Sequence, residues 1–412
     1  MPRKQRRARL LEAIGALEGW GRERSWAGPD PYEALNARRG GPLIRHPYGK
    51  RLLMQLVKRS PLNLRPLLGI DPQLSSMSAA HLLAAAVRLD RGAPLRAWAL
   101  EALEGLRCSG YEEPCWGYHF DVQTRFFFYA AGSPNVIATS FAGQALLDLH
   151  ESESPGSREA ADGALRTALG ACDFLLRHVP QTAAVDGAYF GYLPDDRTPI
   201  HNASLLVSAL LARAGSISGR PELTEPAREG LRYALAHQRP DGSWPYAETQ
   251  QGDWVDGFHT GYVLDALAVC AQGIPEQRDE ALDAYWRGLR FYAERLFDED
   301  GTPRYFVDET YPIDGQSAAQ GIRSFAIAAG LAPEGPERDE WSERAWRVFD
   351  YAQRRLRRRD GAYVFQRRRH WVNRTPHVRW VQAPMLDALA RLRELDRAEA
   401  AEARAAGGAA EA

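Results

Sequence analysis

One structural unit recurs along this chain, and the recurrence constrains the fold more strongly than any other feature of the sequence. Each copy begins with Asp-Gly and an aromatic residue, passes through a polar loop, and ends in a helix rich in small residues. Full copies start at Asp186, Asp241, Asp300 and Asp360, and an irregular earlier copy starts at Pro114. The copies follow one another at intervals of about 55–60 residues, and self-similarity at a regular period indicates a repeat architecture.

Segments with amphipathic helical spacing separate these copies. They carry charges on one face and apolar or aromatic residues on the other, as expected for helices on the outside of a protein. The helices inside the copies are rich in Ala, Gly, Ser and Thr and carry few charges, as expected for helices surrounded by other helices. The amphipathic segments cover residues 158–179, 226–238, 277–297 and 337–356.

This alternation predicts an all-α fold, an (α/α)6 toroid of alternating inner and outer helices. The segments 75–89 and 95–106, with the helices around 43–60, bring the total to about six pairs. Runs of strict strand alternation are almost absent, which argues against an α/β barrel. In such a ring the loops that enter the inner helices gather at one mouth and face a central cavity.

Composition excludes several classes of protein. The 52 Lys and Arg against 53 Asp and Glu give a formal charge of -1, so no overall field attracts nucleic acid. No apolar run approaches the roughly 20 residues of a membrane span, and the N-terminus lacks the apolar core of a signal peptide. We therefore expect no integral membrane segment and a cytoplasmic location. Since the cysteines and histidines lack metal-binding spacing, we also expect no metal and no cofactor.

We expect one toroid domain at residues 20–395, a basic N-terminal tail or helix at 1–19, and a low-complexity C-terminal tail at 396–412.

The stretch DWVDGFHTGY, residues 253–262, opens an inner helix and holds the main candidates for catalysis. Asp253, Asp256 and His259 follow one another at intervals of three, so they share a face if the helix begins near residue 253. One interpretation is helix capping by Asp253 or Asp256. The other is acid–base catalysis that also uses Tyr262, because a carboxylate close to a histidine and under Trp254 would have a shifted pKa. The two roles can coexist.

Asp314 stands at the position of Asp256 in the next copy. Two acids presented by adjacent copies into one cavity is the arrangement that glycoside hydrolysis uses. The alternative interpretation is two parallel helix caps.

Aromatic, amide and arginine side chains of the copies predict the lining of the cavity, because Trp stacks on sugar faces and Arg binds carboxylate or phosphate. Arg125 and Arg379 would hold a uronate carboxylate, whereas Arg367, Arg368 and Arg369 are expected to be solvated. The predicted substrate-binding residues are Trp116, Tyr118, Gln123, Arg125, Asn135, His201, Asn202, Trp254, Tyr311, Gln320, Arg379 and Trp380.

The pattern Q-x-x-D-G-x-W at 238–244 is similar to the QW motif of terpene cyclases, which are also helical toroids. We interpret it as structural: Pro240 ends an outer helix, Gly242 allows a tight turn, and Trp244 packs over that turn. Neither the D-x-D-D nor the D-D-x-x-D motif of cyclase chemistry occurs. The kinship with terpenoid cyclases is thus one of fold.

Four ordered strings, PNVIATSFAGQALLDL, GSWPYAETQQGDWVDGFHTGYVLDAL, YPIDGQSAAQG and VRWVQAPMLDAL, resemble a bacterial family of exopolysaccharide and O-antigen gene clusters. This is the VpsJ-like polysaccharide biosynthesis group, often mislabelled as delta-aminolevulinic acid dehydratase. The resemblance implies a six-hairpin glycosidase-like toroid that acts on an oligosaccharide, polysaccharide or lipid-linked glycan, with association with a polysaccharide-assembly complex. Gly257 and Pro384 depart from the family pattern.

Three functions follow as hypotheses. The first is an enzyme, a hydrolase, lyase or epimerase, that modifies a uronate-containing glycan by acid–base chemistry in the cavity. The second is a non-catalytic glycan-binding or scaffolding subunit, for which aromatic stacking suffices. The third, a prenyl or terpenoid enzyme, draws only on the fold and Trp244, and the arginine-rich mouth argues against it.

Overall fold

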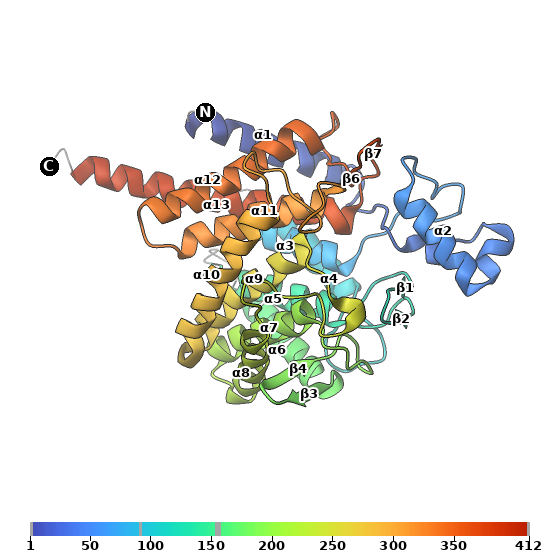
Figure 1. Cartoon of the computed structure of the whole chain (residues 1–412), viewed down its shortest axis with the longest axis horizontal. Helices are drawn as coiled ribbons and strands as arrows, with labels where there is room; N and C mark the ends of the chain where they lie inside the picture. The colour runs from blue at the N-terminus through green and yellow to red at the C-terminus, as the bar shows by residue number, and fades with distance from the viewer. Residues whose placement is uncertain (1–2, 90–92, 153–157, 410–412) are drawn as a thin grey trace.

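The computed structural model describes residues 3–89, 93–152 and 158–409 and confirms the predicted all-α toroid (Figure 1). The inner helices form a closed ring, because each contacts the next and the last contacts the first. In ring order, the inner helices of the described chain are α3 (Ser76–Arg88), α5 (Val136–Glu151), α7 (His201–Ser218), α9 (Gly257–Gly273), α11 (Gly315–Leu331) and α13 (Ala383–Ala409).

One outer helix packs on each inner helix. The partners of α3, α5, α7, α9, α11 and α13 are, respectively, α4 (Ala93–Gly105), α6 (Arg158–His178), α8 (Pro221–Ala236), α10 (Arg278–Arg295), α12 (Pro336–Tyr351) and α1 (Arg3–Arg22).

The sixth pair differs from the prediction. Helix α1 supplies the outer partner of α13, whereas the segment 43–60, expected to contribute to a ring pair, lies outside the ring. Leu10, Leu17 and Trp20 of α1 are buried in the main core. The predicted domain boundary at residue 20 therefore falls inside a ring helix, and the one at residue 395 falls inside α13.

The Asp-Gly turn gives the repeat its physical basis. At Gly242 a Cβ atom would lie 2.6 Å from the carbonyl oxygen of Arg287 on α10, so a side chain is excluded by space as well as by backbone conformation. Trp244 is buried over this turn and donates from Nε1 to the Ala234 carbonyl at 2.8 Å, which confirms the structural interpretation of the QW-like motif. The glycine of each full copy has a positive φ: 121° at Gly187, 91° at Gly242, 87° at Gly301 and 90° at Gly361.

Short strands and single-turn helices occupy the loops between the ring helices. The strands are β1 (Val122–Gln123) with β2 (Phe128–Tyr129), β3 (Gln181–Ala184) with β4 (Gly187–Phe190), and β5 (Ile313–Asp314), β6 (Gln366–Arg367) and β7 (Val372–Asn373), all paired antiparallel. The short helices are η1 (Glu33–Asn36), η2 (Gly41–Arg45), η3 (Gln250–Gly252), η4 (Pro275–Gln277), η5 (Ala352–Leu356) and η6 (Val378–Gln382).

Residues 33–70, which we call the mouth module, stand apart from the ring (Figure 1). The module consists of η1, η2, helix α2 (Pro47–Arg59) and the segment that follows. It has a small core of its own, which contains Leu35, Leu53, Met54 and Val57. The buried Arg65 side chain ties the module together by pairing with Glu33 at 3.3 Å.

A belt of charged side chains crosses the interior of the ring. Arg323 binds Asp265 at 2.8 Å and Asp387 at 2.6 Å, and the buried His81 contacts Asp387 at 3.0 Å. These contacts link α9, α11, α13 and α3 by paired charges, which is how a buried charge becomes tolerable. Within the described residues, no helix is both long enough and apolar enough to cross a membrane.

Candidate active site

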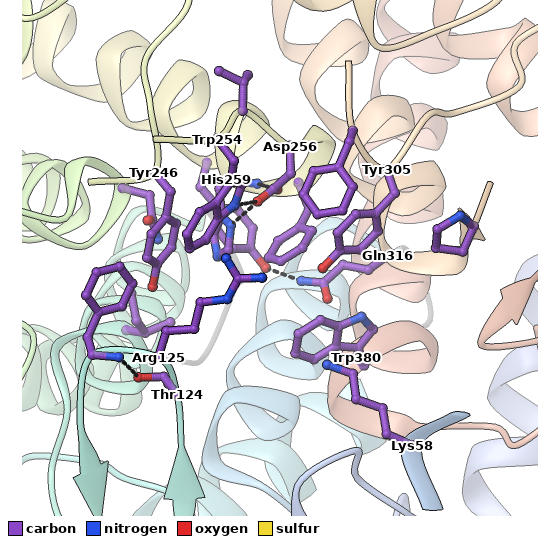
Figure 2. A pocket seen from close by; sticks show the side chains of 18 of the residues that line it. Lys58, Thr124, Arg125, Tyr246, Trp254, Asp256, His259, Tyr305, Gln316 and Trp380 are labelled. Atoms are coloured by element: carbon purple, nitrogen blue, oxygen red, sulfur yellow. Dashed lines mark hydrogen bonds and ion pairs between the residues drawn. The ribbon is translucent and has the colours of Figure 1, made fainter. Parts of the chain in front are cut away.

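A cavity of about 1460 Å³ opens where the loops enter the inner helices, and helix α2 of the mouth module forms one of its walls (Figure 2). Its lining is rich in aromatic side chains, which combine a flat apolar face with a polar edge and therefore suit sugar rings. The aromatic lining residues are Tyr32, Tyr118, Phe126, Tyr129, Tyr192, Tyr246, Trp254, Phe258, Tyr262, Phe291, Tyr305, Phe306 and Trp380.

Asp256 and His259 form a hydrogen-bonded pair at the start of α9. Asp256 caps the helix through Oδ1, which accepts from the His259 backbone N–H at 3.0 Å. Its Oδ2 lies 2.7 Å from His259 Nδ1 and accepts from Trp254 Nε1 at 3.1 Å. Asp256 is buried, whereas the His259 side chain is 24% exposed and lines the cavity. The predicted capping is therefore present, and the same carboxylate also orients the imidazole.

The second imidazole nitrogen of His259, Nε2, is the atom of this pair that can react with a ligand. Because Nδ1 is engaged by the carboxylate, Nε2 is left to face the cavity, and it makes no hydrogen bond with any described residue. A carboxylate on Nδ1 favours the tautomer in which Nδ1 carries the proton and Nε2 accepts one. This is the geometry that a general base requires.

Arg125 covers the histidine from the opposite hairpin. It lies between β1 and β2, with its guanidinium carbon 5.0 Å from the centre of the Trp254 ring. The Trp254 ring in turn stacks on Tyr246, with centroids 4.7 Å apart and an interplanar angle of 10°. In Figure 2 the Arg125 side chain extends toward His259. Beside the imidazole, the cavity wall is therefore a stack of Tyr246, Trp254 and the Arg125 guanidinium.

Phenol and amide groups lie on the other side of the imidazole. Tyr262 is buried one turn after His259, and its hydroxyl accepts from Gln316 Nε2 at 2.6 Å. Burial, with the charges of Asp256 and Asp314 adding to it, raises the pKa of Tyr305 well above the ordinary value. Burial also raises the pKa of Tyr262. Both phenols therefore stay protonated at neutral pH and can donate hydrogen bonds.

Five cations line the cavity without a carboxylate partner among the described residues: Arg51, Lys58, Arg59, Arg125 and Arg368. Lys58 Nζ lies 5.2 Å from the centre of the Tyr32 ring and 5.5 Å from that of Trp380. Burial, together with the nearby charge of Arg59, lowers the pKa of Arg368. Like charges held this close are stabilised by an anionic ligand.

Several solved structures share this fold. The cellobiose 2-epimerase of Spirochaeta thermophila matches with a TM-score of 0.54, 14% identity, and coverage of 79% of this chain and 88% of the epimerase. The GH76 α-mannanase of Bacteroides thetaiotaomicron matches with a TM-score of 0.55, 11% identity, and coverage of 79% and 86%. A polysaccharide lyase matches with a TM-score of 0.53, 14% identity, and coverage of 78% and 91%. The chain has the six-hairpin toroid fold.

At sequence identities this low, the structural likeness shows the fold alone. Fold does not determine the reaction, which depends on the residues of the site. No protein-family model matches the chain, and the search among curated proteins found no match. The specific resemblance to the VpsJ-like group therefore stays a prediction.

Asp314 does not join Asp256 in the cavity, so the predicted pair of catalytic carboxylates is not formed. It is fully buried as the cap of α11, where Oδ1 accepts from the N–H groups of Gln316 and Ser317 and Oδ2 accepts from Gln366 Nε2 at 2.9 Å. The capping interpretation is correct for this acid. Its carboxylate has all its partners within the protein.

Asp314 gives the stability of the protein a pH dependence. Burial raises its pKa to about 6, against the opposing hydrogen bonds, whereas the unfolded value is about 3.9. The folded state thus binds this proton more tightly, and the associated stability is present below about pH 4 and lost as the pH rises through 6. We expect Asp314→Asn, which keeps a capping oxygen, to gain stability relative to the wild type over this range.

The gain should be about 1.4 kcal/mol for each unit of pKa difference removed, measured by urea unfolding between pH 4 and 7. Asp253→Asn, at an exposed acid, is the control. Parallel stability curves for Asp314→Asn and the wild type would contradict the prediction.

Arg379 lines the cavity but is not available for a uronate carboxylate. It binds Asp30 through Nε at 2.6 Å and Nη2 at 3.0 Å, and its guanidinium carbon lies 4.5 Å from the centre of the Tyr118 ring. The buried charge is thus already neutralised by a bidentate partner. Its predicted ligand role is replaced by a structural one, in which it anchors the residues that lead into the mouth module.

The other predicted residues divide into three groups. Tyr118, Gln123, Asn202, Trp254 and Trp380 line the cavity, as predicted. Asp253 lies at its rim, exposed and paired with Arg239. Trp116, Asn135, His201, Tyr311 and Gln320 are not among the lining residues of this cavity.

Each residue of the last group has a visible reason for its position. Trp116 is fully buried and donates from Nε1 to the Leu103 carbonyl. Asn135 caps α5, His201 is paired with Glu248 at 2.6 Å, and Gln320 donates to Asp265 in the charged belt. Tyr311 is 41% exposed outside the cavity.

Two cavity-lining residues, Lys58 and Arg59, had no place among the sequence candidates. Arg368, expected to be solvated, lines the cavity. The signal for Lys58 and Arg59 was a stretch of sequence, residues 34–70, that contains no Asp or Glu. In the described chain, no group of three or more His, Cys, Asp or Glu side chains is arranged to hold a metal ion.

Proposed function

We propose that the protein moves a proton at a sugar carbon of an acidic glycan bound in the mouth cavity, with His259 as the general base. The observation that carries the proposal is the Asp256–His259 pair, which is oriented at Nδ1 and open to the cavity at Nε2. The carboxylate fixes the orientation of the imidazole and favours the tautomer whose free Nε2 accepts a proton.

The substrate is a sugar that carries a carboxylate next to the carbon that loses its proton. Unpaired cations in the cavity, Arg125 among them, favour both the carboxylate and the negative charge that develops on it. The protonated phenols of Tyr262 and Tyr305 supply a proton on the other side of the ring. Return of a proton to the opposite face inverts the carbon, as in an epimerase, whereas loss of the neighbouring glycosidic oxygen cleaves the chain, as in a lyase.

Glycoside hydrolysis is less well supported. It uses two carboxyl groups that flank one bond, and Asp314, the predicted partner of Asp256, is turned away from the cavity. Solved proteins of the same fold include cellobiose 2-epimerases and a polysaccharide lyase, which supports proton transfer at carbon as chemistry that this scaffold accommodates. A role in exopolysaccharide or O-antigen biosynthesis, on a free or lipid-linked glycan, rests on the resemblance to the VpsJ-like group.

The test is to incubate the protein with uronate-containing oligosaccharides in heavy water and to follow them by mass spectrometry and proton NMR. Deuterium at a ring carbon establishes an epimerase, and a new unsaturated end establishes a lyase. Cleavage without either would replace the proposal by hydrolysis. Line broadening of unchanged sugars would identify the alternative, a non-catalytic glycan-binding subunit. In that case the aromatic walls and the stacked Trp254 would bind the sugar rings.

The unpaired cations of the cavity should act on substrate binding. We expect Lys58→Gln combined with Arg368→Gln to raise KM for an acidic oligosaccharide by about tenfold, since a hydrogen bond to a charged group contributes about 1.5–3 kcal/mol. The measurement is a comparison of KM for uronate-containing and neutral oligosaccharides. Lys50→Gln, on the same helix but outside the cavity lining, is the matched control, and an equal effect of the double variant on neutral sugars would contradict the assignment.

A further inference from the structure

An apolar stripe runs along the outward face of α2 in the mouth module. Tyr48, Leu52 and Leu56 follow one another at intervals of four, so their side chains lie on one face of the helix. Their exposed fractions are 72%, 53% and 53%. Leu62 and Leu67, in the segment after the helix, are 68% and 73% exposed. Large apolar side chains gathered in this way on a surface mark an interaction site.

These residues are not needed for the folding of the module. Its small core is supplied by another face of α2, which buries Leu53, Met54 and Val57. A further face contributes Gln55 and Lys58 to the cavity. Helix α2 therefore has one face for the core and one for the cavity, and the stripe is left exposed by the described part of the chain.

The charge of the module indicates what the stripe contacts. Residues 34–70 contain eight Lys or Arg and no Asp or Glu, in a chain whose overall charge is -1. Arg39, Arg45, Arg51 and Arg59 of the module are exposed, and Arg51 and Arg59 also border the cavity. A helix that combines exposed leucines with flanking basic residues lies in the interface of an anionic membrane, where its apolar face enters the headgroup and acyl boundary.

We propose that the mouth module docks the protein on an anionic lipid surface, with Tyr48, Leu52 and Leu56 inserted between the headgroups and the surrounding Arg and Lys side chains on the phosphates. A second copy of the chain is a poorer partner for this face. A two-fold contact would bring together two modules in which basic side chains far outnumber the single acid, Glu33, and their like charges would repel.

Docking has a consequence for the cavity. Because α2 forms one wall of the cavity, the cavity lies beside the headgroups when the helix is at the surface, within reach of a glycan that is attached to a lipid. This consequence rests on the proposed function, whereas docking itself does not. Binding is therefore measured without any glycan.

The experiment is co-sedimentation of the whole protein with vesicles of phosphatidylcholine, with or without phosphatidylglycerol. We expect binding to the anionic vesicles that weakens as salt is raised. Leu52→Ser combined with Leu56→Ser should weaken it by about tenfold or more, because two apolar side chains are lost from the interface. Arg45→Gln should weaken it by about fivefold, as expected for one charge at an anionic surface.

Leu11→Ser is the matched control, because Leu11 is a similarly exposed leucine, 46%, on α1 of the ring. Circular dichroism establishes that each variant is folded. Equal binding of the wild type and the double leucine variant would overturn the proposal. So would a wild type that ignores the vesicles but elutes as a dimer that the leucine substitutions dissociate, since the stripe would then bind a second copy.

Discussion

His259→Gln should lower the rate of proton exchange into an acidic oligosaccharide by about 10²- to 10⁴-fold, the usual contribution of a general base. Glutamine is close to histidine in size and can keep a hydrogen bond to Asp256, so the local packing is retained. Its amide does not accept a proton at neutral pH, so the chemistry is lost. The measurement is deuterium incorporation by NMR, with KM determined separately to separate binding from turnover.

A matched control exists elsewhere in the chain. His178 is also partly exposed and contacts a carboxylate, Glu113, at 3.2 Å, but it is not among the cavity residues. His178→Gln should leave exchange unchanged. If His259→Gln retained the rate of the wild type, the base would have to be another group in the cavity.

Asp256→Asn should lower turnover to a similar extent while leaving the fold nearly unchanged. Asparagine is as good a helix cap as aspartate, so the bond from the His259 backbone N–H to Oδ1 is kept. The other carboxylate oxygen accepts from both Trp254 Nε1 and His259 Nδ1. An NH₂ group at that position would face two donors, which favours the opposite imidazole tautomer and places the proton on Nε2.

The separation of these roles can be measured. Nitrogen chemical shifts of the His259 imidazole report the tautomer directly, and a purely structural role for Asp256 would leave them unmoved. Asp256→Ala removes the cap as well, and its free energy of unfolding should fall by about 1 kcal/mol. An Asp256→Asn variant that turned over at the rate of the wild type would remove this carboxylate from the mechanism.

The ring was predictable because its units are local. Each Asp-Gly turn joins an outer helix to the loop of the next inner helix, and the backbone conformation that requires Gly242 is set within a few residues. Pairing of α1 with α13 was not predictable in this way, since the two helices are separated by most of the sequence. Nothing in the local pattern of α1 distinguishes a ring helix from an amphipathic arm.

The cavity lining was predictable only in part, for a geometric reason. Caps and ligands lie at the same end of the inner helices, so Asn135, Asp256 and Asp314 share one sequence position, the N-cap of an inner helix. Whether the second oxygen of a cap meets the cavity or a neighbouring loop depends on contacts such as that of Gln366 with Asp314. Those contacts join different copies, and the spacing within one copy does not contain them.

The junction of α1 with α13 also determines when the molecule can be completed on the ribosome. Helix α1 precedes the other ring helices in the chain, and its partner α13 follows them. During translation the earlier hairpins can stack on one another as they emerge, but the apolar face of α1 that holds Leu10 and Leu17 stays uncovered until α13 leaves the exit tunnel. Until then the nascent ring is an open arc with one exposed edge, and it closes only when α13 packs on α1.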